Sequence, residues 1–518
     1  MTRNQKQISV SSAIIILVIL LNIFIVRSAL SGSNGLFLLL LISLPLLFVA
    51  IHNVRQKKHA ILRNYPLIGY LRFWLEAVRP ELRQYFFESD TDGRPFSRRQ
   101  RSIVYQRAKN ERETVAFGMQ LDPGKPGFEW VAHSIYPVLI KNKDLRIWIG
   151  NAQCSQPYHA SIFNIGAMSY GALSKTAIQA LNEGAALGGF ALNTGEGGIS
   201  PYHLHGGDLI WQIGTGYFGC RNADGNFDSE LFRINAARPS VKMIELKLSQ
   251  GAKPGHGGIL PAIKNSPEIA EIRNVTAGTA VLSPSAHAAF HNAEGMMHFI
   301  EQLREGSGGK PVGFKLCIGN KKEFHEICYA IRKTHIIPDF IVVDGSEGGT
   351  GAAPLEFTDH IGMPLYEALS FVTKTLKNYK LDKEIKIIAA GKIITGFDIM
   401  KAIALGASAC YSSRGMMFAL GCIQALRCDS GKCPVGVATQ EPNLYKGLDI
   451  TDKRVRVANF HSNTIKATVE MMESCGFKNV AEINVSSFFR KIDQVHSSPF
   501  SEIYGIEKNI IQSDFINN

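Results

Sequence analysis

The chain has 518 residues, of which 45% are hydrophobic and 19% charged, a composition that fits a globular protein with a large core. Its net charge of +12 would suit nucleic acid, an acidic membrane surface or anionic ligands, but no nucleic-acid module and no long Lys/Arg run occurs in the body of the chain. Most of the nine cysteines stand singly in apolar surroundings, which excludes a small-domain disulfide framework.

Two apolar runs, Ile8–Val26 and Gly35–Ile51, open the chain. Each is close to the roughly 17–20 residues that cross a bilayer, and the link between them has the Ser and Gly of a tight turn. Positive residues flank the pair on both outer sides: Arg3, Lys6, Arg55, Lys57, Lys58 and Arg63. The positive-inside rule predicts a transmembrane helical hairpin over residues 1–60, in the inner (cytoplasmic) membrane, with the main body of the chain facing the cytoplasm. A cleavable signal peptide and a buried globular hairpin are the rival interpretations.

Residues 61–150 form a mixed lead-in region, in which Tyr70–Phe87 is predicted to be an amphipathic helix. From about residue 158, short apolar β-type runs alternate with helical stretches. The eight predicted strands are Ile162–Met168, Phe190–Asn193, Met243–Leu248, Thr279–Leu282, Val312–Cys317, Phe340–Val343, Ile385–Ala389 and Ala409–Ser412. This α/β alternation predicts a (β/α)8 TIM barrel over residues 151–440, followed by a C-terminal helical extension over 441–518. A doubly wound open sheet is the alternative.

Glycines and polar residues gather where the predicted strands end. The segments are 166–174 (GAMSYGALS), 193–198 (NTGEGG), 245–258 (ELKLSQGAKPGHGG), 344–351 (DGSEGGTG) and 390–396 (AGKIITG). The carboxyl-end loops of a barrel form its active site, and glycine-rich loops that open helices can cradle a phosphate. Four lysines at strand ends favour a phosphorylated cofactor and an anionic substrate over simple tight turns: Lys247, Lys253, Lys315 and Lys392.

Three cysteines, Cys422, Cys428 and Cys433, form a C-x5-C-x4-C group directly after the last predicted strand, with Pro434 next. Three thiolates at short spacing followed by proline are typical of an iron–sulfur cluster, whereas zinc would need a fourth ligand and a CxxC-type spacing.

Two further patterns do not indicate a site. The segment Gly214–Gly219 matches GxGxxG, but it lies between the predicted second and third strands and lacks the strand–helix–acid context of dinucleotide binding. His203 and His205 could be ligands, but a surface loop is the favoured interpretation.

Taken together, these segments resemble the FMN-binding synthase domain of the glutamate synthase family, from about residue 155 to 470. The resemblance is carried by AMSYGALS, NTGEGG, QGAKPG, GGTGA and the run CPVGVATQ that includes the third cysteine. It implies FMN in the barrel and a 3Fe–4S cluster held by Cys422, Cys428 and Cys433. It also implies the reductive amination of 2-oxoglutarate to L-glutamate, in which ammonia or an amine forms the imine and FMN, reduced through the cluster, supplies the hydride.

The same resemblance implies roles for single residues. FMN would be held by Met168, Ser169, Lys247, Lys315, Gly348, Gly349, Gly391 and Lys392, and 2-oxoglutarate by Gln250, Lys253 and Arg273. Glu196 would lie near the ammonia entry, so Glu196 and Lys253 are the expected catalytic residues. The electron donor would be a partner such as a ferredoxin or a reductase subunit.

The sequence also departs from the family pattern. Full-length members begin with a glutamine amidotransferase domain, whereas this chain begins with the apolar hairpin and is expected to use ammonia or an amine. His256 stands where many members have Glu, and Ser285–His287 replaces a Pro/His-rich run beside the expected substrate pocket. Two alternatives follow: a membrane-linked FMN/iron–sulfur oxidoreductase for another 2-oxo or 2-hydroxy acid, and a non-catalytic redox sensor.

Overall fold

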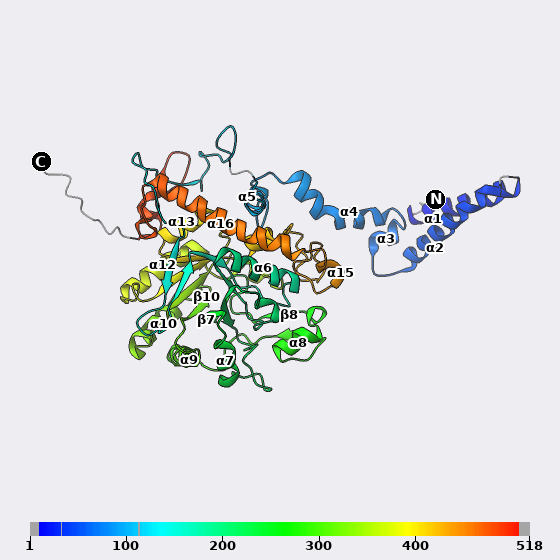
Figure 1. Cartoon of the computed structure of the whole chain (residues 1–518). Coiled ribbons are helices and arrows are strands. Elements are labelled where there is room, and N and C mark those ends of the chain that lie inside the picture. The colour runs from blue at the N-terminus through cyan, green and yellow to red at the C-terminus, as the bar shows by residue number, and fades with distance from the viewer. Residues whose placement is uncertain (1–9, 33, 112–113, 507–518) are drawn as a thin grey trace, which may run out of the picture. The chain divides into compact units, whose positions relative to one another are not determined.

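The structure is a computed structural model that describes residues 10–32, 34–111 and 114–506. The chain divides at Arg98 into two compact units, a small N-terminal one and a large one (Figure 1). Arg3 and Lys6, which contribute to the predicted membrane orientation, lie outside the described residues.

The N-terminal unit begins with two packed helices, α1 (Val10–Leu30) and α2 (Leu40–Arg55), joined through the short 3-10 helix η1 (Asn34–Leu39). By length and composition, Val10–Leu30 and Gly35–Arg55 could each cross a membrane. Their polar groups pair with each other: Ser43 Oγ donates to Asn22 Oδ1 at 2.9 Å, and Asn22 Nδ2 donates to the Val18 carbonyl at 2.8 Å. An apolar solvent would require such internal pairing, so the packing suits the predicted transmembrane hairpin.

Three short elements complete this unit. They are α3 (Ala60–Asn64), α4 (Gly69–Leu82) and the π-helical turn η2 (Arg83–Phe87). The last two adjoin directly and together cover the amphipathic helix that was predicted over Tyr70–Phe87.

The large unit is a closed barrel of eight parallel strands, which confirms the predicted fold class. In chain order the strands are β4 (Phe163–Ile165), β5 (Ala191–Asn193), β6 (Asp208–Ile213), β7 (Val241–Lys247), β10 (Val312–Leu316), β11 (Phe340–Asp344), β12 (Lys386–Ala390) and β13 (Ala409–Ser412). Nearly all their residues are buried, because the interior of the barrel is packed on one face and helices cover the other (Figure 1). The open-sheet alternative is therefore wrong.

One of the eight predicted strands is wrong. Thr279–Leu282 is not a barrel strand: β9 (Val281–Leu282) pairs only with β8 (Ile259–Leu260), in an excursion between β7 and the following barrel helix. The missing strand is β6, which lies between Gly207 and Gly214. The short helix α8 (Pro267–Arg273) has the sequence pattern of a helix that connects two barrel strands, but it lies between β8 and β9 in the same excursion.

The helices around the barrel are α6 (Lys175–Gly188), α7 (Ser229–Ala236), α9 (Ala293–Gly306), α10 (Lys321–Thr334), α12 (Leu365–Asn378), α13 (Gly396–Ala404) and α16 (Ile450–Cys475). The long α16 packs on α6 and α13 and closes the ring. Smaller elements decorate the unit: α5 (Arg98–Ala108), α11 (Leu355–His360), α14 (Arg414–Ala419), α15 (Pro442–Tyr445), α17 (Phe500–Ile503) and the sheet β1–β14–β15 (Glu129–Val131, Phe488–Lys491, Ser497–Pro499).

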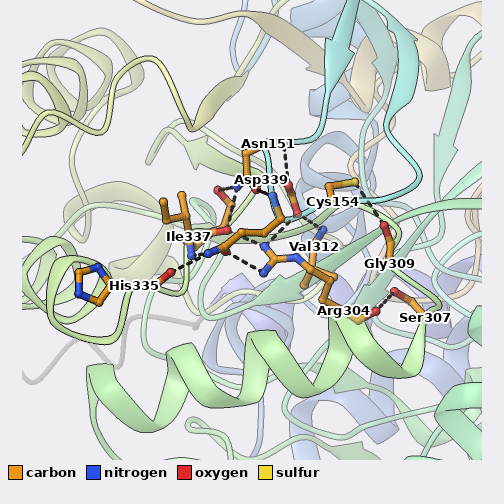
Figure 2. A network of polar contacts seen from close by, with 11 residues as sticks. Asn151, Cys154, Arg304, Ser307, Gly309, Val312, His335, Ile337 and Asp339 are labelled. Carbon is orange, nitrogen blue, oxygen red and sulfur yellow. Dashed lines mark hydrogen bonds and ion pairs between the residues drawn. The ribbon is translucent and has the colours of Figure 1, made fainter.

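A hairpin of β2 (Arg146–Ile149) and β3 (Tyr158–Ser161) lies at the amino-terminal end of the barrel, where Ile149 and Ala160 join the same buried cluster as Phe340. Its turn is held by Asp339, the fully buried residue just before β11 (Figure 2).

Asp339 has partners from three segments. Its two carboxylate oxygens accept hydrogen bonds from the backbone N–H of Asn151 and of Val312, both at 2.8 Å, and an ion pair from Arg304 at 3.1 Å (Figure 2). The network therefore stabilises the amino-terminal end of the barrel. In barrels of this kind the active site lies at the opposite, carboxyl-terminal end of the strands.

We expect Asp339→Ala to lower the free energy of unfolding of the barrel by about 3–5 kcal/mol, because Arg304 would stay buried without its counter-charge. Urea unfolding followed by circular dichroism measures the change. The control is Glu230→Gln, which removes an exposed ion pair with Arg233 on α7. It should unfold at the same urea concentration as the wild type. Equal unfolding of both variants would contradict the role given to Asp339.

Candidate active site

The predicted site residues come together at the carboxyl ends of the barrel strands. Seven of the eight barrel strands contribute a predicted site residue, either near the end of the strand or in the loop that follows it. The contributing residues are Met168 and Ser169 after β4, Glu196 after β5, Lys247 to Lys253 in and after β7, Lys315 in β10, Gly348 and Gly349 after β11, Gly391 and Lys392 after β12, and the three cysteines after β13.

The charge at the centre of the site is the carboxylate of Glu196. Its Oε1 lies 3.0 Å from Lys247 Nζ, and both side chains are largely buried. Burial alone would raise the pKa of Glu196, but the positive charges of Lys247, Arg273 and Lys253 outweigh it and hold the pKa below its ordinary value. One carboxylate therefore faces three cations, which leaves net positive charge for an anionic ligand.

The two cations predicted to bind substrate are both buried, at 2% exposure for Lys253 and 5% for Arg273. Burial lowers the pKa of Lys253 to about 8 and that of Arg273 to about 10, although Glu196 opposes both shifts. Arg273 Nη2 donates to the Tyr170 carbonyl at 3.0 Å, and its guanidinium lies 5.1 Å from the Phe218 ring centre. Its Nε has no hydrogen-bond partner in the described part of the chain. Gln250 shares a turn with Lys253, whose N–H donates to its carbonyl.

Glycines make the space for Glu196. A Cβ on Gly214 would lie 2.7 Å from Glu196 Cβ, and one on Gly258 would lie 2.5 Å from Glu196 Oε1. Gly214 opens the GxGxxG segment, which directly follows β6 and therefore lies between the third and fourth barrel strands, not between the second and third as predicted. No helix starts there before α7, so the pattern serves the packing of Glu196 and is not a dinucleotide fingerprint.

His287 contacts the backbone of Lys247 and is 5% exposed. Its Nε2 lies 2.9 Å from the Lys247 carbonyl and its Nδ1 lies 3.1 Å from the Tyr217 hydroxyl. A carbonyl can only accept, so Nε2 carries the proton and Nδ1 accepts from Tyr217. Sequence reasoning treated His287 only as a departure from the family, and the structure identifies it as a positioning residue.

His203 is completely buried, so its interpretation as part of a surface loop is wrong. Its Nδ1 lies 2.8 Å from Ser200 Oγ, and burial lowers its pKa to about 4. The ring of His256 packs edge-on against the ring of Phe357, with 5.3 Å between the ring centres.

A second charge network lies beside the first. Lys315 Nζ is 3.1 Å from Asp344 Oδ2, and Asp344 also accepts from the Gly251 N–H at 2.9 Å. Burial would lower the pKa of Lys315, but Asp344 and the buried Glu245 raise it. The loops after β7 and β11 are in contact here through Gly251 and Gly345. Only glycine fits at position 251, because a Cβ there would lie 1.7 Å from the Gly345 carbonyl oxygen.

The loops after β11 and β12 have the properties of a phosphate cradle. A Cβ on Gly349 would lie 2.8 Å from Arg414 Nη1, and Gly391 has a φ of 151°. Arg414 donates to the Glu347 carbonyl at 2.6 Å, and burial lowers its pKa to about 10. Sequence reasoning missed Arg414, although its place directly after the last strand could have indicated it. Bare backbone beside a partly buried guanidinium fits the phosphate of FMN.

The cysteine segment adjoins this cradle. A Cβ on Gly351 would lie 3.2 Å from Cys428 Cβ, so the loop after β11 touches the cysteine loop. On its other side, Ser174 Oγ donates to the Gly436 carbonyl at 2.7 Å and Gln440 Nε2 to the Leu173 carbonyl at 2.8 Å. The segment is therefore fixed between the loops of the first and sixth barrel strands.

Lys264 is a buried cation that binds the backbone of the cysteine segment, and sequence reasoning missed it. It is 3% exposed, and its Nζ donates to the carbonyls of Cys428 at 2.5 Å, Ala438 at 3.2 Å and Ala172 at 3.3 Å. A buried cation beside thiolates offsets the negative charge that an iron–sulfur cluster brings.

The thiols differ in exposure, and Cys433 is the most buried of the three. Burial raises the pKa of Cys422 to about 12, and the neighbouring Cys428 and Cys433 add to the shift. No three Cys, His, Asp or Glu side chains of the described ranges converge closely enough to hold one metal ion. In a multi-iron cluster each thiolate binds a different iron, so the soft donor set and the nearby cation are what fit such a group.

Comparison with known proteins gives consistent matches. Residues 138–478 match the conserved region in glutamate synthase. A glutamate synthase large subunit-like protein of Bacillus subtilis (strain 168), YerD, is 38% identical over 92% of this chain and 98% of its own length. An archaeal glutamate synthase (NADPH) of Methanocaldococcus jannaschii is 34% identical over 70% of this chain and 67% of its own.

Two further matches cover the relatives unequally. The glutamate synthase (NADPH) large chain of Bacillus subtilis is 32% identical over 65% of this chain but only 21% of its own length. Among solved structures, a flavocytochrome b2 mutant with pyruvate bound is 13% identical, covers 89% of this chain and all of its own, and has a TM-score of 0.42.

Proposed function

Because the chain belongs to the glutamate synthase family, an oxidoreductase family, we propose that it converts 2-oxoglutarate and ammonia, or an amine, into L-glutamate or its N-substituted form. The observation that carries the proposal is the convergence of Lys247, Lys253 and Arg273 on the single carboxylate of Glu196 at the open end of the barrel. A dicarboxylate substrate needs such an excess of buried positive charge.

FMN is the proposed resident cofactor, and it supplies the hydride that reduces the imine carbon. The cradle at Gly348, Gly349 and Gly391 would hold its phosphate, with Lys392 and Arg414 as counter-charges. Met168, Ser169, Lys247 and Lys315 would hold the rest of the group at the strand ends. Lys315 stays protonated between Asp344 and Glu245, so it can donate hydrogen bonds there at neutral pH.

The chain's own residues bind and orient the substrates. Lys253, Arg273 and Gln250 would bind the carboxylates of 2-oxoglutarate and so fix the 2-oxo carbon. Glu196 stays ionised and would accept a hydrogen bond from the attacking nitrogen. Ammonia adds to the carbonyl carbon, water leaves, and the imine carbon then takes up the hydride while the nitrogen takes up a proton.

Electrons would enter through a 3Fe–4S cluster on Cys422, Cys428 and Cys433. The contact of Cys428 with the loop after β11, at Gly351, supports a short route from the cysteine segment to the cofactor cradle. A ferredoxin or reductase partner would supply the electrons. The two apolar helices would tether the enzyme to the cytoplasmic membrane with the barrel in the cytoplasm.

The test uses the full chain, purified in detergent and reduced without oxygen. Mixing it with 2-oxoglutarate and ammonium or methylamine should reoxidise the flavin and yield glutamate or N-methylglutamate, and omitting either substrate should stop the reaction. Flavin absorbance and chromatography of the product give the result. A rate of flavin reoxidation that neither substrate changes, or reduction of the oxidised protein by a 2-hydroxy acid, would overturn the proposal in favour of another acid as substrate.

A further inference from the structure

Helix α4 and the π-helical turn η2 carry an apolar stripe along residues 69–87. At 100° per residue, one side of this segment collects Leu71, Trp74, Leu75, Val78, Leu82 and Tyr85. The opposite side carries Phe73, whose ring meets His59 edge-on at 5.8 Å within the same unit. The segment is therefore amphipathic, and its own unit uses the face away from the stripe.

The stripe is open to solvent. Trp74 is 61% exposed, Leu71 55%, Tyr85 56% and Leu75 47%, and Phe86 and Phe87 at the end of the segment reach 76% and 80%. Soluble proteins rarely leave so many large apolar side chains exposed in one continuous row, so the row indicates a partner surface.

The charges beside the stripe indicate what that partner is. Arg72, Arg79 and Arg83 follow one another at helical spacing along one edge of the stripe. Between residues 55 and 83 the chain has seven Lys/Arg and only two acidic residues, Glu76 and Glu81. A narrow apolar stripe edged by arginines suits the boundary between acyl chains and anionic headgroups better than it suits a second copy of itself, whose arginines would repel it.

The start of α4 is fixed to the end of the second apolar span. Asn53, 2% exposed and two residues before the end of α2, donates from Nδ2 to the Pro66 carbonyl at 2.6 Å. Its Oδ1 accepts from the Tyr70 hydroxyl at 3.2 Å. If α2 crosses the bilayer, these two bonds hold the first turn of α4 at the depth where the span leaves it.

We propose that residues 69–87 lie in the interface of an anionic phospholipid bilayer, with Trp74 and its stripe among the acyl chains and the arginines among the headgroups. The inference rests on the membrane insertion of α1 and α2 proposed above. It adds a second, parallel contact with the lipid, which would hold the chain against the surface beyond the tether itself.

Brominated lipid, which quenches tryptophan on contact, tests the proposal in the full chain. Trp74 is the only tryptophan before residue 98, so the difference between the wild type and Trp74→Phe isolates its signal. The protein is reconstituted into vesicles of phosphatidylcholine and phosphatidylglycerol with bromines near either end of the acyl chain. We expect quenching of the Trp74 component to be about twofold stronger with bromines near the headgroup.

Matched variants separate the causes. Trp148→Phe removes an exposed tryptophan of the large unit and should keep the quenched component. Replacing Arg72, Arg79 and Arg83 by Gln should reduce quenching of Trp74 by about half, whereas the same change at Lys321, Lys322 and Lys333 on α10 should not.

Flotation after an alkaline wash reports insertion of α1 and α2 separately. A chain that floats with the vesicles while Trp74 stays unquenched would overturn the inference and leave the tether intact, and the stripe would then be covered by protein. A chain that does not float would overturn both. Neither outcome bears on amination, which is measured in detergent.

Discussion

Lys253→Ala should lower kcat/KM for 2-oxoglutarate by about 10- to 100-fold, mainly through a higher KM. The ammonium is buried beside Glu196, so its loss leaves a substrate carboxylate without its charged partner. A hydrogen bond to a charged group contributes about 1.5–3 kcal/mol, and each 1.4 kcal/mol is a factor of ten. Initial rates of product formation against 2-oxoglutarate concentration measure the effect, and Lys322→Ala on the exposed face of α10 is the control.

The pH dependence distinguishes a charge effect from a packing effect. Since burial lowers the pKa of Lys253 to about 8, the protonated form that binds an anion is lost as the pH rises through 8. KM should therefore rise between pH 7 and pH 9 in the wild type. Lys253→Arg keeps its charge over this range and should flatten the rise, whatever it does to the absolute rate. A KM that stays constant with pH in the wild type would contradict a direct role for this ammonium.

Cys428→Ser should abolish the bound iron and, with it, turnover driven by a protein electron donor. A serine hydroxyl is a hard, weakly acidic ligand that does not replace a thiolate on iron–sulfur centres. Iron content, visible absorbance and the electron paramagnetic resonance signal of the oxidised protein measure the loss. Turnover with a chemical reductant that acts directly on the flavin should persist.

Cys154→Ser is the matched control, because Cys154 lies on the β2–β3 turn, where its Sγ contacts the Gly309 carbonyl at 3.3 Å (Figure 2). It should keep the iron and the signal of the wild type. Iron retained in Cys428→Ser would remove this residue from the ligand set.

The sequence was sufficient to predict the barrel because buried parallel strands are short, apolar and evenly spaced. The strand β6 was not predicted because its sequence, DLIWQI, is flanked by Gly206, Gly207 and Gly214, and clustered glycines are typical of loops. The excursion after β7 supplied a false strand in its place, since α8 and β9 follow each other as a crossover helix and a barrel strand would. Periodicity could not separate the two cases, because only the closed pairing of β5 with β6 and of β6 with β7 does so.

The site was predictable where motifs carry it and not where tertiary contacts do. Glu196, Lys247 and Lys253 stand in recognisable glycine-rich segments, Arg273 was expected from the family resemblance, and the fold brings the four together. Lys264 and His287 act through backbone carbonyls of residues 164 and 40 positions away, respectively, and no local pattern marks such contacts. His203 looked like a loop residue, but the barrel buries it.

The contact between Gly251 and Gly345 restricts how this chain can vary. Any side chain at position 251 would collide with the Gly345 carbonyl oxygen, unless the end of β11 moved away and took Asp344, the partner of Lys315, with it. The loops after β7 and β11 are 93 residues apart, yet they must be inherited as a matched pair. Exchanging the loop after β7 for one with any residue other than glycine at position 251 would therefore displace the loop after β11 as well.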